Sequence, residues 1–163
     1  GKDFVTEVEG YVESHGLEGI ITFKEFSGSK GLGCTLKGSK KNIPVLSTFG
    51  ATEGLNSASG KTIGVVGTPH LPEYALKLLG HAVGVDVSPD KFDFKCRTVR
   101  RHEFEVSLWC VSDDEFFQAL EFAVVERELI QSVGRSRILE HDVEVHMFSN
   151  YVLPGGELWR KVA

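Results

Sequence analysis

Two arginines follow a predicted helix at a spacing that suits phosphate chemistry. They are Arg135 and Arg137, in the string QSVGRSR at residues 131–137. A guanidinium is permanently charged and its planar donors match phosphate oxygens, so either side chain could stabilise a phosphoryl group. Cations near the carboxyl end of a helix are also common because of the helix dipole. Ion pairs with Glu140 or Asp142 are therefore the alternative interpretation.

A second polar segment follows a predicted buried strand and reads STFGATEGLN, residues 47–56. Thr48 offers a hydroxyl at the end of that strand, and Asn56 offers a side-chain amide. Lys24 directly follows another predicted strand, at residues 19–23. Taken alone, Thr48 is a strand-end hydroxyl and Asn56 a turn residue.

Residues 54–62 read GLNSASGKT, which is close to a phosphate-binding P-loop. The P-loop motif has four residues between its two glycines. Here five residues separate Gly54 from Gly60. A P-loop also leads into a helix whose amides face the phosphates, whereas Gly60-Lys61-Thr62 leads into a predicted strand. We therefore expect a surface turn, with a stand-alone small P-loop enzyme as the alternative.

Further basic residues and two tryptophans could either contact nucleic acid or have a purely structural role. The basic loop at 27–42 can contact phosphate or be solvated. The arginines of a hairpin at 92–111 can touch a nucleic-acid strand, or the hairpin can cover a sheet edge. The tryptophans can stack on bases or pack internally. These residues are Lys30, Lys37, Lys40, Lys41, Arg97, Arg100, Arg101, Trp109 and Trp159.

Composition limits the class of protein. The 163 residues are 41% hydrophobic and 25% charged, which suits one globular domain spanning 1–163. A net charge of −5 disfavours an all-round basic coat. Three cysteines at wide spacing fit neither a disulfide framework nor a zinc cage, the six histidines show no metal-ligand spacing, and a cytoplasmic location is expected. No apolar run is long enough to span a bilayer, so no membrane partner is expected.

Periodicity predicts strands alternating with helices. Strands are expected at 19–23, 43–48, 62–67 and 143–149, and helices at 4–15, from Pro72 to Gly84 and at 113–133. A capping box of Ser112 and Glu115 opens the last helix. The apolar stripes expected to face inward are Ala75, Leu78, Leu79, Ala82 and Val83 in one helix, and Phe116, Leu120, Ala123, Val124 and Ile130 in the other. This order predicts a three-layer α/β domain with a largely parallel sheet and an inserted β-hairpin.

The segments at 47–56 and 131–137 resemble motifs V and VI of superfamily 2 helicases, in the family's order, and the strand before Lys24 occupies the place of motif IV. The likeness covers roughly residues 4–150. It implies the second, C-terminal RecA-like domain of an ATP-dependent helicase or translocase, with a P-loop NTPase-like fold.

The resemblance implies roles for particular residues. One of Arg135 and Arg137 is the arginine finger, which meets the charge that develops on the γ-phosphoryl group when two motor domains close. The nucleotide contacts implied are Gly54, Asn56, Gln131 and Gly134, and the nucleic-acid contacts implied are Thr48 and Lys24. Two positions depart from the family pattern, since Asn56 replaces an aspartate and Ile138 stands where a second arginine is usual.

The resemblance also implies partners. ATP and Mg²⁺ are held mostly by an N-terminal RecA-like domain of the same polypeptide, because this sequence shows no Walker A and no Asp-Glu box, and DNA or RNA is the track. The segment is expected to be inactive as an ATPase alone. A non-catalytic α/β interaction module is the second alternative.

Overall fold

Residues 2–30, 33–50 and 56–157 are described by the computed structural model, and the chain divides into two units. Unit 1 comprises residues 1–69 and 128–149, and unit 2 comprises residues 70–127 and 150–163. The predicted single domain with an inserted hairpin stays a prediction, and each unit is described by itself.

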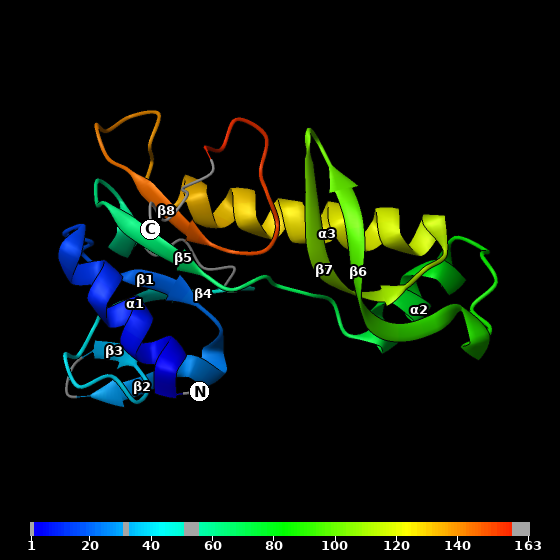
Figure 1. Ribbon diagram of the computed structural model, residues 1–163, viewed down its shortest axis with the longest axis horizontal. Helices are drawn as coiled ribbons and strands as arrows, with labels where there is room; N and C mark the ends of the chain where they lie inside the picture. The colour runs from blue at the N-terminus through cyan, green and yellow to red at the C-terminus, as the bar shows by residue number, and fades with distance from the viewer. Residues whose placement is uncertain (1, 31–32, 51–55, 158–163) are drawn as a thin grey trace. The chain divides into compact units, whose positions relative to one another are not determined.

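Unit 1 contains a parallel sheet of four short strands, as predicted (Figure 1). The strands are β1 (Ile20–Thr22), β4 (Val45–Thr48), β5 (Ile63–Val66) and β8 (Val145–Phe148), in the order β4-β1-β5-β8. Every residue of β1 and β5 is buried. Strands covered on both faces read as continuous apolar runs, which is why these two were recognisable in the sequence. The protein is therefore a mixed α/β structure with a parallel sheet.

Helix α1 (Lys2–Ser14) packs on this sheet through Val8 and Val12, as its periodicity predicts. Their side chains belong to one apolar cluster, whose buried members are Val8, Val12, Leu17, Ile20, Leu36, Ile43, Val45 and Val66. The cluster fixes the position of β1 and β4, and with it the position of the polar residues that follow these strands.

The predicted loop at 27–42 is wrong in its first part, because it contains an antiparallel hairpin. Strands β2 (Ser27–Lys30) and β3 (Gly33–Leu36) pair through their backbones, and Leu36 is buried in the cluster under α1. Glycine and serine gave no alternating pattern, so the pairing had no signal in side-chain hydrophobicity. The remainder is anchored by Glu9, whose carboxylate accepts hydrogen bonds from Ser39 Oγ at 2.6 Å and Lys40 N at 2.7 Å.

Unit 2 contains the predicted β-hairpin. Strands β6 (Phe92–Arg101) and β7 (Phe104–Ser112) are antiparallel and joined by His102 and Glu103. His102 adopts a left-handed backbone with φ of 54°, as a two-residue hairpin turn requires. A short 3₁₀ turn (Pro89–Lys91) precedes the hairpin.

Helix α2 (Glu73–Ala82) buries a different face from the one predicted. Leu76 and Gly80 are buried, whereas Leu78 is 68% and Val83 65% exposed. The reason is close packing at Gly80, where an added Cβ would lie 2.6 Å from the ring of the fully buried Phe117. The buried face is thus marked by a small residue rather than by the wider apolar stripe.

Helix α3 (Glu115–Gly134) has the predicted length, and its residues up to Arg127 belong to unit 2. The cap predicted at Ser112 is wrong: Asp114 Oδ1 accepts hydrogen bonds from the amides of Phe116 and Phe117 at 3.0 and 3.3 Å. The predicted stripe is also rotated, since Phe116, Ala123 and Ile130 are exposed while Phe117, Phe122, Val125 and Leu129 are buried. Leu120 and Val124 are half-buried.

Within the described part of the chain, none of the helices has the length and apolar character needed to cross a lipid bilayer.

Candidate functional site

The structure brings Asn56, from the first predicted segment, beside Arg137, from the second, in unit 1. A short 3₁₀ turn, η2 (Asn56–Ala58), begins at Asn56, and Arg137 Nη2 donates to Asn56 Oδ1 across 3.5 Å. A second link is made by the backbone, where Gly60 N donates to Ser136 O at 3.0 Å. A candidate arginine finger and a predicted nucleotide contact, distant in sequence, therefore lie side by side.

Arg137 also forms the ion pair that the alternative interpretation anticipated. Its Nη1 lies 3.0 Å from Glu140 Oε2, with the two side chains 46% and 60% exposed. Pairs this exposed contribute little free energy, so the guanidinium can exchange a carboxylate for a phosphate at small cost. The backbone at Arg137 is left-handed, with φ of 55°.

The other residues predicted from the 131–137 string lie in or just after the last turn of α3. Gln131 and Gly134 are exposed, and Arg135 is half-buried with its amide donating to Ser132 O at 3.3 Å. Gly54 lies outside the described residues, as does Trp159. Among these predicted residues, Asn56 is the one whose side chain contacts the Arg137 guanidinium in the described part of the chain.

Thr48 and Lys24 lie at one edge of the sheet. Thr48 ends β4 and pairs with Thr22 of β1, and the exposed Lys24 begins the 3₁₀ turn η1 (Lys24–Phe26) just after β1. Because β4 and β1 are parallel, their carboxyl ends meet at the same edge. Phe49 N donates to Thr22 O at 3.0 Å and holds the start of the following loop against β1.

Sequence reasoning missed further polar groups at this edge. Thr68 and Ser149 follow β5 and β8, and their hydroxyls lie 2.9 Å apart. Glu128 of α3 accepts a hydrogen bond from Gly50 N at 3.1 Å. Thr68 directly follows one predicted parallel strand and Ser149 ends another, and these positions were a usable signal, whereas nothing local marks Glu128.

Four backbone amides of the P-loop-like string, those of residues 59–62, have internal acceptors. Ser59 N donates to Asn56 O, Gly60 N to Ser136 O, Lys61 N to Ala58 O, and Thr62 N to Glu18 Oε2 at 3.1 Å. A phosphate cradle needs such amides unpaired and convergent. The string leads into β5, as expected of a surface turn.

Two of the three hairpin arginines have partners in unit 2. Arg97 donates to the carbonyls of Cys110 and Asp93, and Arg101 Nη2 lies 3.0 Å from Glu126 Oε2. Arg100 is exposed and forms no ion pair with any described residue. The structural interpretation therefore holds for Arg97 and Arg101.

A hydrogen-bonded triad accounts for the position of Arg101. Its Nη2 donates to Tyr151 Oη at 2.5 Å, and Tyr151 Oη donates to Glu126 Oε2 at 2.6 Å. These contacts, the tyrosine first, lower the pKa of Glu126, while burial and the same carboxylate raise the pKa of Tyr151 well above its ordinary value. The tyrosine thus remains a protonated donor.

Comparison with protein-family models, with curated proteins and with solved structures finds no match to this chain. Among the described residues, no group of three or more histidine, cysteine, aspartate or glutamate side chains is arranged to hold a metal ion.

Proposed function

We propose that unit 1 acts as the second motor domain of an ATP-dependent superfamily 2 helicase or translocase. In this role a RecA-like, three-layer arrangement supplies the arginine finger and part of the nucleic-acid track. ATP and Mg²⁺ are held mostly by an N-terminal RecA-like domain of the same polypeptide.

The observation that carries the proposal is the pairing of Arg137 with Asn56. A guanidinium on an exposed segment beside an amide acceptor offers positive charge and hydrogen-bonding groups to a nucleotide from another domain. Arg137 is free to reorganise, because its ion pair with Glu140 is solvent-exposed. Gln131 and Gly134 are both exposed and are the further nucleotide contacts in this proposal.

The carboxyl edge of the sheet supports the second half of the proposal. Thr48 offers a hydroxyl and Lys24 a cation at the ends of adjacent parallel strands, and both groups suit a nucleic-acid phosphate. Nucleotide contacts and track contacts are then carried by loops of one sheet. Closure of two such domains would couple ATP turnover to movement.

The test is ATP hydrolysis by the polypeptide that carries this segment together with its Walker A domain. Arg135→Ala and Arg137→Ala are compared, and the finger is the residue whose loss lowers kcat by roughly 10³- to 10⁵-fold with little change in KM. Parent-like turnover in both variants would overturn the proposal in favour of a non-catalytic module. Hydrolysis by the 163-residue chain alone, abolished by Lys61→Ala, would instead establish a small P-loop enzyme.

A further inference from the structure

The β6–β7 hairpin of unit 2 has one buried face and one exposed face. Leu108 and Cys110 are buried, whereas Phe94 is 56% and Trp109 48% exposed. The two exposed rings stack on each other, with centroids 5.2 Å apart and planes inclined by 25°. Contiguous exposed apolar surface, unlike single exposed apolar side chains, is a feature of interaction sites.

Phe94 is connected through His70 to the buried carboxylate of Glu121. Glu121, fully buried, accepts a hydrogen bond from Val111 N at 3.0 Å and lies 3.2 Å from His70 Nδ1. The His70 ring meets Phe94 edge to face, with centroids 6.4 Å apart. Phe94 thus contacts both His70 and Trp109.

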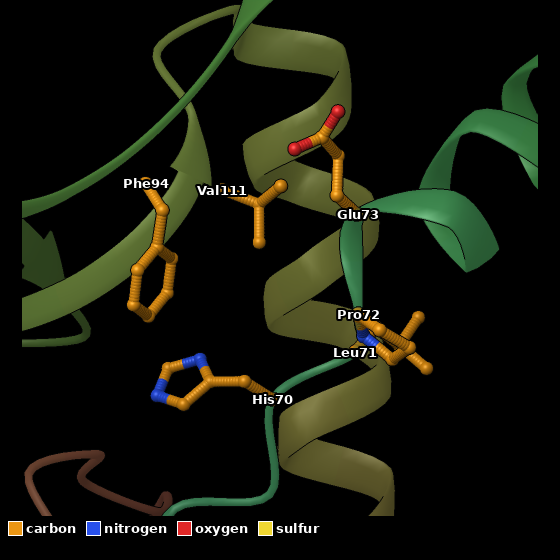
Figure 2. A pocket seen from close by; sticks show the side chains of 6 residues that line it. All are labelled: His70, Leu71, Pro72, Glu73, Phe94 and Val111. Atoms are coloured by element: carbon orange, nitrogen blue, oxygen red, sulfur yellow. The ribbon is translucent and has the colours of Figure 1, made fainter.

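Figure 2 shows a pocket that Phe94 lines, with Phe94 and His70 on one side and Leu71, Pro72 and Glu73 on the other. Val111 forms the remaining lining. The pocket leaves open space beside the phenyl ring of Phe94.

Polar groups continue the exposed face away from the rings. Cys96, paired with Trp109 in the ladder, is followed on the same face by Thr98, which pairs with Ser107, and then by Arg100, opposite Glu105. At about 3.3 Å per residue, Arg100 lies roughly 13 Å along the strand from Cys96. Lys95 pairs with Asp93, so Arg100 is the exposed hairpin cation that has no ion pair among the described residues.

We propose that Phe94 and Trp109 form a stacking platform for the bases of a single-stranded nucleic acid, with Arg100 contacting a phosphate farther along the strand. Stacked rings accept any base, because every base has a π-face. The hydroxyls of Thr98 and Ser107, and the Arg100 guanidinium farther along the same face, suit a sugar-phosphate chain. The inference rests on the proposed function, since a motor domain needs a nucleic-acid partner.

The test is fluorescence anisotropy of the 163-residue chain with labelled single strands of DNA, of RNA, and of an abasic phosphodiester backbone of equal length. Trp109→Ala and Phe94→Ala should each weaken binding of the base-containing strand by roughly 5- to 100-fold and leave abasic binding unchanged. Trp109→Phe should retain affinity, because it keeps a ring. The DNA and RNA arms identify the source of the strand.

Controls separate the platform from the sheet edge. Tyr74→Ala removes a 74% exposed ring from α2 of the same unit and should leave the affinity for every strand unchanged. Arg100→Ala should weaken base-containing and abasic strands alike and reduce the salt dependence by about one counterion. Equal loss for both kinds of strand in Trp109→Ala, no loss at all, or failure of the parent to bind any single strand would overturn the platform.

The same assay distinguishes the two proposals. If Thr48→Ala and Lys24→Ala weaken binding while Trp109→Ala does not, the platform is wrong and the track at the sheet edge stands. If Trp109→Ala weakens binding while Thr48→Ala and Lys24→Ala do not, the platform is supported and the proposed track at the sheet edge is wrong. The ATP hydrolysis test of Arg135 and Arg137 decides the motor function independently of either result.

Discussion

The guanidinium of Arg137 joins two segments that are 81 residues apart, because its Nη2 lies 3.5 Å from Asn56 Oδ1 while its Nη1 lies 3.0 Å from Glu140 Oε2. The carboxylate and the amide hold the cation on the protein surface. In the proposed function, a phosphoryl oxygen competes with Glu140 for that cation.

Glu140→Gln separates this role from a purely structural one. The variant should lower the free energy of unfolding by less than about 1 kcal/mol, because both partners are exposed. If Arg137 serves a nucleotide, ATP turnover by the complete polypeptide should not fall, since the neutral amide competes less well for the guanidinium. A loss of turnover as large as that of Arg137→Ala would contradict the proposed exchange.

The triad of Arg101, Glu126 and Tyr151 should make unit 2 sensitive to acid. The pKa of Glu126 is lower in the folded state than in the unfolded chain. Its contribution is therefore present above the unfolded pKa, near 4.5, and is lost as the pH falls through the folded value. Glu126→Gln should cost about 1 kcal/mol at neutral pH, and its difference from the parent should shrink in acid.

Urea denaturation of the parent and of Glu126→Gln, at neutral and at acidic pH, measures the stability lost at each pH. The loss should be smaller at acidic pH. A variant that loses equal stability at every pH would show that the carboxylate acts by packing, and not through its charge.

The three cysteines should differ in reactivity toward a thiol reagent under native conditions. Cys34 and Cys96 are exposed, whereas Cys110 is buried, and burial raises the pKa of its thiol to about 11. The thiolate is the reactive form, so Cys110 should react only after unfolding. A chromogenic disulfide reagent should count two thiols in the native protein and three in denaturant, and a native count of three would refute this.

Gly80→Ala should destabilise unit 2 although alanine is the better helix former. Its Cβ would lie 2.6 Å from the Phe117 ring and 3.1 Å from Val87 Cγ1, so we expect a net loss of about 1 to 3 kcal/mol. Gly10→Ala is the matched control, because it also lies within a helix and its Cβ would have no neighbour within 4 Å. That variant should gain about 0.5 to 1 kcal/mol. Thermal unfolding of the two variants decides the comparison.

The sheet of unit 1 was predictable because burial on both faces leaves a continuous apolar run, as in β5. The hairpin of unit 2 was predictable for a different reason, since its side chains alternate between Leu108 and Cys110 on one face and Trp109 on the other. In both cases a local pattern follows directly from a local environment.

Helix faces were less predictable, because a helix rich in apolar residues offers more than one stripe. In α2 the face around Leu76 is selected by Phe117, a partner that lies far away in the sequence. In α3 the cap is Asp114 rather than Ser112, because the serine hydroxyl is turned toward the carbonyl of Lys91. Such choices depend on tertiary contacts that no window of sequence contains.

The geometry of the candidate site was not predictable from the sequence. Arg137 and Asn56 were both identified from their motifs, yet only the folded chain shows the guanidinium beside the amide. The platform was missed as a unit, because Phe94 and Trp109 become neighbours only through the register of β6 and β7.

The left-handed backbone at Arg137 has a consequence for how this position can change. Most side chains are strained in that conformation, and glycine is not, so exchange for glycine would relieve about 1 kcal/mol while removing the charge. At this position, therefore, glycine favours stability whereas arginine favours the proposed function. Laboratory selection for thermal stability alone should enrich glycine at position 137, whereas selection for ATP hydrolysis should retain the arginine.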